Sequence, residues 1–141
     1  MTADEVIDML GLAPHPEGGH YLETWVDRDG AERPSGTAIY FLLRAGESSH
    51  WHRVDAVEIW HFHAGAPLEL SISPDAAGPA ETHMLGPDLA AGERPQAIVP
   101  KDHWQSARTT GAWTLVGCTV SPGFRFEGFT LAPPGFYIPR G

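Results

Sequence analysis

Apolar and polar residues alternate in short runs along most of this chain, a pattern typical of β-strands rather than helices. The run over residues 37–43 is almost continuously apolar, which suits a strand buried on both faces. Short strands at this regular spacing, separated mostly by Gly, Pro and Asp turns, predict a β-sandwich or barrel. The predicted strands cover residues 21–26, 37–43, 50–54, 58–63, 68–73, 81–85, 96–99, 103–108, 113–120 and 128–131.

One short helix is predicted at the N-terminus. Thr2 and Glu5 have the spacing of a capping box, and Gly11 can adopt the left-handed conformation that ends a helix. Its apolar side would consist of Val6, Ile7 and Leu10. The segment 12–20 follows with two prolines and two glycines, so we expect it to be irregular. The segment 27–36 has the residues of a turn.

Length and composition indicate one globular domain of residues 1–141. We divide it into a helix over 1–11, a Pro/Gly loop over 12–20 and a barrel over 21–141. With 42% hydrophobic and 19% charged residues the chain can form a real core. Its 16 glycines and 13 prolines fit many short strands joined by turns.

The net charge of the chain limits which classes of partner it can bind. Nine basic and 18 acidic residues give a net charge of −9, which opposes non-specific binding to nucleic acid or an anionic membrane. A phosphorylated small ligand stays compatible, since a few local arginines could outweigh the global charge. No charged-then-apolar leader and no apolar run of membrane-spanning length is present. We therefore expect a cytoplasmic protein that binds a small polar metabolite.

A candidate metal site centres on two histidines. His50 and His52 would point to the same face of a strand, and Glu58 would enter from the next strand. Imidazole with carboxylate favours zinc, iron, manganese or nickel. Gln105 could add its amide oxygen as a fourth ligand, although it serves more naturally to orient a substrate. His103 lies on the same side of its strand and could substitute. The sequence is compatible with both a metal-bound and a metal-free site.

The stretch Gly46-x3-His50-x-His52-x5-Glu58-x6-Gly65 resembles the first signature of the cupin superfamily. Pro100-x-Asp102-x-x-Gln105 occupies the frame of the second signature, with Gln105 in the place of a metal-ligand histidine. Further segments are similar to a small single-domain cupin family of unassigned function. These segments are His15-Pro16-Glu17-Gly18-Gly19, 37–43, His52-Arg53, 58–62, Val99-Pro100, Trp104-Gln105 and 115–124.

This resemblance implies an all-β, cupin-type double-stranded β-helix (a jelly-roll barrel) with a ligand site inside. It suggests an enzyme resembling sugar or nucleotide-sugar isomerases and epimerases, with or without a divalent metal. A non-catalytic module that senses or stores a small ligand is the alternative, and an interaction protein with a degenerate cavity is a third possibility. A homodimer is expected, because open sheet edges and exposed aromatics are readily covered by a twofold partner.

The candidate site residues follow from these arguments. Glu58, His52 and Glu17 are candidates for proton transfer, Glu17 because a segment rich in proline and glycine can hold a charge at a barrel mouth. Arg53 could hold a carboxylate or phosphate with its planar guanidinium. Together with Arg53, the candidate ligand-binding residues are Tyr40, Trp60, Phe62, Trp104 and Gln105.

Three further residues have less direct roles. If Glu58 faces the barrel interior, alternation makes His61 and His63 face outward, toward a covering layer or a partner subunit. A β-bulge would bring them into the pocket instead. Cys118 lies in an apolar run, which favours a buried, unreactive thiol over a nucleophile.

Overall fold

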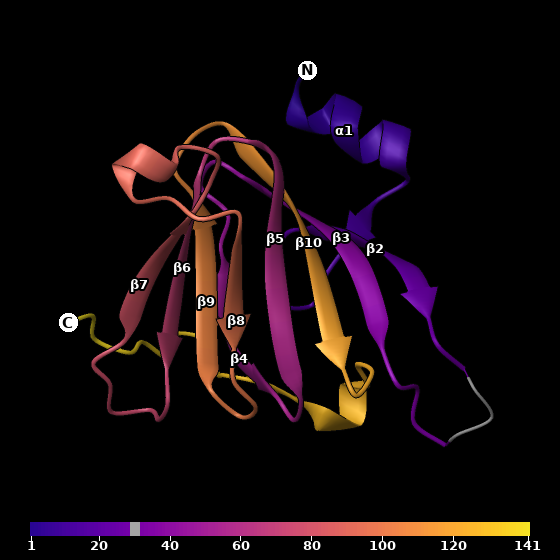
Figure 1. Cartoon of the computed structure of the whole chain (residues 1–141), viewed down its shortest axis with the longest axis vertical. Coiled ribbons are helices and arrows are strands. Elements are labelled where there is room, and N and C mark those ends of the chain that lie inside the picture. The colour runs from indigo at the N-terminus through magenta and orange to yellow at the C-terminus, as the bar shows by residue number, and fades with distance from the viewer. Residues whose placement is uncertain (29–31) are drawn as a thin grey trace.

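The computed structural model describes residues 1–28 and 32–141, which form two antiparallel sheets preceded by one α-helix (Figure 1). One sheet has the order β1 (Ala13–Pro14), β2 (His20–Val26), β3 (Thr37–Arg44), β10 (Trp113–Ser121), β5 (Val57–Gly65) and β8 (Gln96–Val99). The other has the order β11 (Phe129–Leu131), β4 (Ser49–Val54), β9 (Trp104–Thr109), β6 (Leu68–Ser73) and β7 (Glu81–Leu85). The predicted all-β architecture is confirmed.

The strand pattern predicted from the sequence recurs with small shifts at the ends. Three short elements were not predicted: β1 within the Pro/Gly loop, and the 3-10 helices η1 (Leu89–Ala91) and η2 (Phe126–Gly128). Each is too short for a periodic pattern to indicate it. The predicted turn over 27–36 falls partly on residues 29–31, which lie outside the described residues.

Helix α1 (Ala3–Leu10) has the predicted caps. The Glu5 N–H donates to the Thr2 hydroxyl at 3.2 Å, the Thr2 N–H donates to the Glu5 carboxylate at 3.1 Å, and Gly11 ends the helix with φ of 69°. Its buried side chain, Val6, packs against Leu42 on the outer face of β3. Because Phe41 and Leu43 face the interior, β3 is buried on both sides, as its continuous apolar run indicates.

The space between the sheets is filled at one end and hollow at the other. The filled end is an apolar core built from both sheets. Its buried members are Phe41, Leu43, Trp60, Leu68, Leu70, Ile72, Leu85, Val99, Ala107, Val116 and Cys118. At the other end the inward positions carry polar and aromatic side chains, and these line a cavity. The fold therefore places a pocket inside the barrel.

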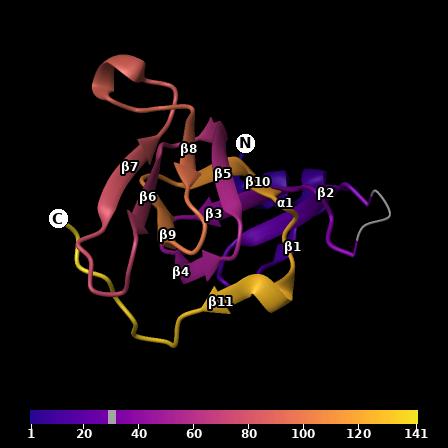
Figure 2. The same ribbon diagram turned by 60° about the horizontal axis from the view of Figure 1, so that its bottom comes forward.

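The C-terminal segment covers the outer face of the five-stranded sheet. Figure 2 shows it running from β11 past β4 toward β7. Trp51 of β4 packs there against Ala132 and Ile138, and the Trp104 ring of β9 lies 5.0 Å from the Phe136 ring. Trp51 and Trp104 therefore pack against this layer on the outside of the sheet rather than in the barrel interior.

The outer face of the six-stranded sheet holds two histidines. The His61 ring nitrogen Nε2 lies 3.0 Å from the Thr119 hydroxyl, and the His63 ring centroid lies 6.1 Å from that of Tyr40. Alternation along β5 thus places His61 and His63 opposite Glu58, outside the pocket.

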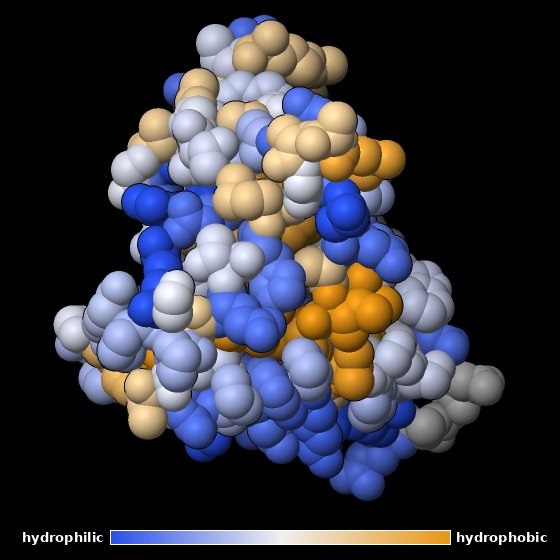
Figure 3. All heavy atoms as spheres, turned by 60° about the vertical axis from the view of Figure 1, so that its left-hand side comes forward, coloured by the Kyte–Doolittle hydropathy of each residue, from blue (hydrophilic) through white to orange (hydrophobic). Residues whose placement is uncertain are grey.

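One side of the molecule is largely hydrophilic with a distinct hydrophobic patch (Figure 3). The expected homodimer stays a prediction.

A tight turn over residues 15–19 carries the loop across the end of the barrel. The His15 N–H donates to the Gly19 carbonyl, and the Gly18 N–H donates to the His15 carbonyl, each at 3.0 Å. The His50 N–H donates to the Glu17 carbonyl at 2.8 Å, which ties the turn to β4. Gly18 has φ of 107°, and a Cβ there would collide with the Ser48 carbonyl oxygen. We call residues 15–19 the strap.

Replacing Gly18 tests how rigidly the strap is held. Gly46 provides a matched control, because it also has positive φ, of 84°, but a Cβ added there would meet only open space. We expect Gly46→Ala to cost about 1 kcal/mol from backbone conformation. Gly18→Ala should cost about 1 to 3 kcal/mol more, because the backbone must also shift. Urea unfolding measures both, and equal losses would contradict a tightly packed strap.

Candidate functional site

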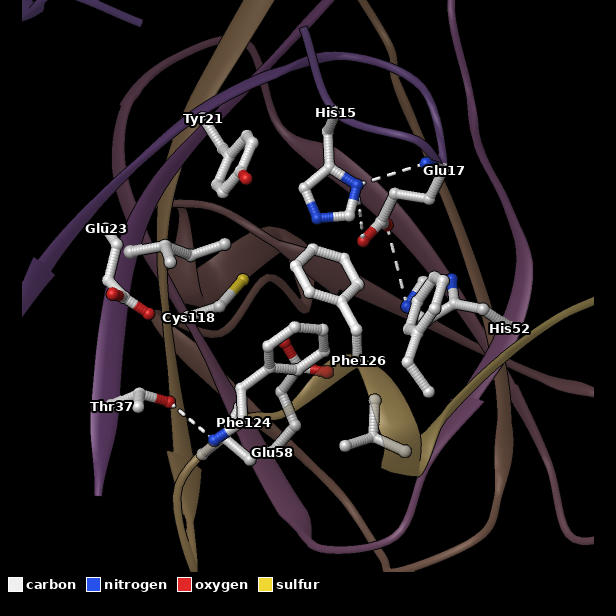
Figure 4. A pocket seen from close by; sticks show the side chains of 14 residues that line it. His15, Glu17, Tyr21, Glu23, Thr37, His52, Glu58, Cys118, Phe124 and Phe126 are labelled. Atoms are coloured by element: carbon white, nitrogen blue, oxygen red, sulfur yellow. Dashed lines mark hydrogen bonds and ion pairs between the residues drawn. The ribbon is translucent and has the colours of Figure 1, made fainter. Parts of the chain in front are cut away.

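The cavity lies between the two sheets beneath the strap and has a volume of about 160 Å³ (Figure 4). It draws on β2, β3, β5 and β10 of one sheet, on β4 and β11 of the other, and on two loops. Its lining residues are His15, Glu17, Tyr21, Glu23, Thr37, Ile39, His52, Val54, Glu58, Cys118, Val120, Phe124, Phe126 and Phe129. The three predicted proton-transfer residues, Glu17, His52 and Glu58, all lie here.

His15 is a neutral imidazole with a defined tautomer. Its Nδ1 accepts the Glu17 backbone N–H at 3.0 Å, so this nitrogen carries no proton. The neutral ring therefore has its proton on Nε2. Burial, with a smaller contribution from His52, lowers the pKa of His15 to about 4. His15 thus gives the site a hydrogen-bond donor without a positive charge at neutral pH.

Glu17 is buried without a cationic partner. Its carboxyl group accepts a hydrogen bond from the Ser49 hydroxyl and lies 3.4 Å from His15 Nδ1 and 3.5 Å from His52 Nε2. Burial raises the pKa of Glu17 to about 8, although the Ser49 hydrogen bond opposes this shift. At neutral pH the predominant form of Glu17 is the protonated acid.

His52 complements that acid. Its Nδ1 lies 2.7 Å from the His50 carbonyl oxygen, which can only accept, so Nδ1 carries the ring proton. In the neutral ring Nε2 is then an acceptor facing Glu17. Burial lowers the pKa of His52, with Glu58 opposing the shift. The protonated Glu17 carboxyl can therefore donate toward His52 Nε2, whose lone pair would repel a carboxylate at this position.

Glu58 lies on the other side of the cavity and is held from behind (Figure 4). The Trp60 indole N–H donates to Gln105 Oε1 at 2.8 Å, which directs the Gln105 amide N–H toward Glu58 Oε1 at 2.9 Å. Burial raises the pKa of Glu58 to about 7, while His52 lowers it and Glu17 raises it further. Glu58 is therefore a base that is partly ionised at neutral pH.

The structure does not bring His50 into this pocket, contrary to the alternation argument. A register shift between Ser49 and His52 interrupts the pairing of β4 with β9. Ser49 and His52 both reach Glu17. His50 instead donates from Nε2 to the Pro133 carbonyl oxygen at 3.0 Å, away from the cavity. A β-bulge makes two residues occupy the place of one, which alternation alone does not foresee.

The predicted metal ligands do not fit a metal centre. Among the described residues no three His, Cys, Asp or Glu side chains are arranged to hold an ion. His50 is directed to Pro133, and the Gln105 amide oxygen is occupied by the Trp60 N–H. Only His52 and Glu58 of the predicted set face the cavity. The alternative ligand His103 lies on a turn, 3.3 Å from the Lys101 carbonyl oxygen.

The six predicted ligand-binding residues lie around the pocket rather than on its described wall. Trp60 and Gln105 support Glu58 from behind, and Phe62 packs against the apolar core. Arg53 lies on the outside, with its guanidinium 5.0 Å from the centre of the Trp104 ring. Tyr40 is on the outer face of β3 beside His63. Arg53 therefore does not offer a positive charge to the cavity.

Several lining residues escaped the sequence argument. Phe124 and Phe126 reach the cavity from a turn-rich segment before β11, and Phe129 reaches it from β11, which was predicted as a strand but not as part of the pocket wall. The Phe124 N–H donates to the Thr37 hydroxyl at 2.9 Å, which fixes this segment to β3. Cys118 also lines the cavity, and burial, then Glu58, raise the pKa of its thiol, so it is unreactive as predicted from its apolar setting.

Comparison with known families decides the classification. The family model described as "Cupin superfamily (DUF985)" matches residues 4–132. The chain belongs to this cupin family. A crystal structure of a Shewanella oneidensis protein is 44% identical, covering 94% of this chain and 85% of that one with a TM-score of 0.87. A hypothetical protein from Leishmania major is 30% identical, covering 96% and 90% with a TM-score of 0.84.

More distant cupins show the fold alone. An oxalate decarboxylase variant from Bacillus subtilis is 13% identical, covering 84% of this chain and 29% of that one with a TM-score of 0.65. A comparison with curated proteins found no match. Within the described part of the chain, no helix has the length and apolar character needed to cross a membrane.

Buried protonated Glu17 should make stability depend on pH in an unusual direction. Its folded pKa of about 8 lies above the ordinary 4.5, so the folded protein holds a proton that the unfolded chain releases. This stabilisation is complete below pH 4.5 and is lost as pH rises through about 8. Glu58 acts in the same direction up to about 7, whereas His15 acts oppositely between about 4 and 6.5.

We therefore expect the thermal midpoint to fall as pH rises from 6.5, the ordinary value for His15, through about 8, the folded pKa of Glu17. Glu17→Gln should make this fall shallower, because the amide does not ionise. Glu81→Gln is the control, since the Glu81 side chain is 83% exposed and outside the cavity. Calorimetry in matched buffers measures the slope, and an unchanged slope in Glu17→Gln would contradict the assignment.

Proposed function

We propose that this cupin is an acid–base isomerase acting on a small polar carbonyl compound, by a mechanism that does not require a metal. The observation that supports it best is the pair of buried acids, Glu17 and Glu58, in one cavity with different partners: the Gln105 amide donates to Glu58, whereas Glu17 faces the His52 Nε2 acceptor. Groups whose pKa values are separated by their surroundings are suited to opposite roles in proton transfer. Both neutral histidines add polar contacts without fixed charge.

Glu58 and Glu17 can together provide every proton transfer that the isomerisation requires. The substrate for this step is a 2-hydroxy carbonyl compound. Glu58 in its carboxylate form takes the proton from the hydroxyl-bearing carbon next to the carbonyl group. The electron pair of the broken C–H bond forms a C=C bond, and the carbonyl oxygen takes the Glu17 proton to give an enediol. Glu58 then returns its proton to the former carbonyl carbon, the other hydroxyl returns its proton to Glu17, and the new carbonyl group at that hydroxyl completes the isomerisation.

The cavity restricts the substrate to a small molecule. Its volume of about 160 Å³ is below the roughly 300 Å³ at which sites for drug-sized ligands begin. A sugar fragment or another short metabolite fits this volume better than a whole nucleotide-sugar. The described wall also provides no arginine or lysine for a diphosphate. We therefore favour a small carbonyl compound over the nucleotide-sugar suggested by general resemblance to cupins.

Hydrogen exchange tests the proposal on many candidate substrates at once. Protein treated with a chelator is incubated in D2O with a panel of short aldoses, ketoses and 2-hydroxy aldehydes, and NMR follows loss of the C–H signal next to the carbonyl. We expect exchange into at least one compound. Glu58→Gln should reduce its rate by about 10²-fold or more, because a general base is lost.

His83→Gln is the control for that substitution, since His83 lies on β7 outside the cavity and should leave exchange unchanged. Exchange that disappears in chelator and returns with a transition metal would overturn the metal-independent mechanism. Absence of exchange across the panel, with saturable binding of one compound, would favour the non-catalytic binding module.

The pH dependence of exchange gives a further test. Glu58 must be ionised and Glu17 protonated, so kcat/KM should rise through about pH 7 and fall through about pH 8. Both limbs belong to the coupled pair rather than to one residue each. The profile is measured on the active compound at constant ionic strength. A rate that stays flat from about one pH unit below the lower limb to one unit above the upper limb would be inconsistent with these roles.

A further inference from the structure

The charges around the cavity are one-sided. Glu17, Glu23 and Glu58 line it, and among the described lining residues there is no lysine or arginine. Both lining histidines have one ring nitrogen fixed by a backbone group, His15 as acceptor and His52 as donor. An anionic ligand would therefore lose its hydration here without meeting an opposite charge, which is costly. A cationic ligand would meet Glu58 in its ionised form and the exposed side chain of Glu23, while protonated Glu17 adds no charge.

An adjoining hollow shares Glu23, Thr37, Phe124 and Phe126 with the cavity and is lined by Arg28, Arg33 and Arg125. Two of these arginines are held by Asp55. Arg125 lies between two pocket phenylalanines in the sequence, yet its guanidinium is 3.4 Å from Asp55. Arg33 makes two contacts with the same carboxylate, at 2.7 and 3.1 Å, and donates to the Gly123 carbonyl at 2.9 Å. Asp55 thus holds both arginines while the Phe124 and Phe126 rings reach the cavity (Figure 4).

Aromatic faces complete the wall. The Phe124 ring centroid lies 5.0 Å from that of Phe126 and 5.8 Å from that of Phe129, at interplanar angles of 84° and 65°. Tyr21 contributes a fourth ring from β2, beside His15. Phe124 and Phe129 are half-buried, whereas Phe126 is 54% exposed and also contacts solvent. The face of an aromatic ring is electronegative and attracts ammonium groups, most strongly where water is excluded. Several rings at angles to one another can surround an alkylated ammonium group.

From this arrangement we infer that the cavity binds a small organic cation, with the charged group against Phe124, Phe126 and Phe129 and toward the carboxyl groups. The inference rests on the proposed function only in assigning the same pocket. If both hold, the substrate is a short carbonyl compound that also carries an ammonium group. A neutral sugar would use the hydrogen-bonding groups of this site but leave the aromatic cluster without a role in selectivity.

Matched probes that differ in charge test the inference. Choline has a neutral isostere, 3,3-dimethylbutan-1-ol, and 3,3-dimethylbutanoate provides an anion of similar shape. Calorimetric titration should show binding of choline, with the neutral isostere about tenfold weaker or worse. The anion should not bind. Equal binding of choline and the neutral alcohol, tighter binding of the anion, or no binding of choline at saturating concentrations would overturn the inference.

Two variants locate the bound charge. Phe126→Leu keeps an apolar side chain but removes a ring, so choline should bind several-fold more weakly while the neutral alcohol changes little. Glu23→Gln should also weaken choline selectively, since an attractive charge is lost. Tyr137→Leu is the control, because Tyr137 is 62% exposed and outside the cavity. Thermal unfolding establishes that each variant is folded, and equal losses for both probes would contradict a cation site.

The result separates this inference from the proposed function. Selective choline binding, with no exchange either in the neutral panel or in 2-hydroxy aldehydes that carry an ammonium group, would support the cation site and contradict the isomerase. Exchange in a neutral compound, with no preference for choline over its isostere, would support the isomerase and contradict the cation site.

Discussion

The burial of the Glu17 carboxyl group without a cation is the constraint on which the site depends. A carboxylate in such surroundings is strongly disfavoured, so the group retains its proton and requires acceptors and donors at fixed positions. Ser49 of β4 donates to the carboxyl group, and His52 Nε2 of the same strand is the acceptor it faces. The strap can place Glu17 there only because Gly18 adopts a backbone conformation that other residues rarely adopt.

The same constraint explains why the barrel is only half filled. Inward positions at one end of the shared strands are apolar and pack as a core, whereas those at the other end include Thr37, Glu58 and His52 among apolar neighbours. These three side chains cannot simply pack together as apolar ones do, because each buried polar group needs a partner. The Trp60–Gln105–Glu58 chain satisfies one side, and the strap satisfies the other. The remaining volume is the cavity.

Much of this fold follows from the sequence, because strand alternation, turn residues and the Thr2–Glu5 capping box are local signals. Glu58, His52 and Glu17 could be assigned to the pocket on alternation and on the constrained Pro/Gly loop. His50 could not, since the register shift in β4 depends on its pairing with β9. The pocket positions of Phe124, Phe126 and Phe129 depend on how the C-terminal segment docks, through Phe124 on Thr37 and through β11 on β4. Those contacts are between residues far apart in the chain.

Gln105 links these observations. A histidine there could share a metal with His52 and Glu58, but an amide is a weak ligand and cannot ionise. Its oxygen is fixed by the Trp60 N–H, so its own N–H must face Glu58. This supports the carboxylate with one neutral hydrogen bond, weaker than the charge of a metal ion, and Glu58 keeps a raised pKa and a proton affinity useful near neutrality. Gln105 in place of a ligand histidine thus leaves Glu58 with one amide hydrogen bond and a raised pKa, which supports the proposed role of Glu58 in proton transfer.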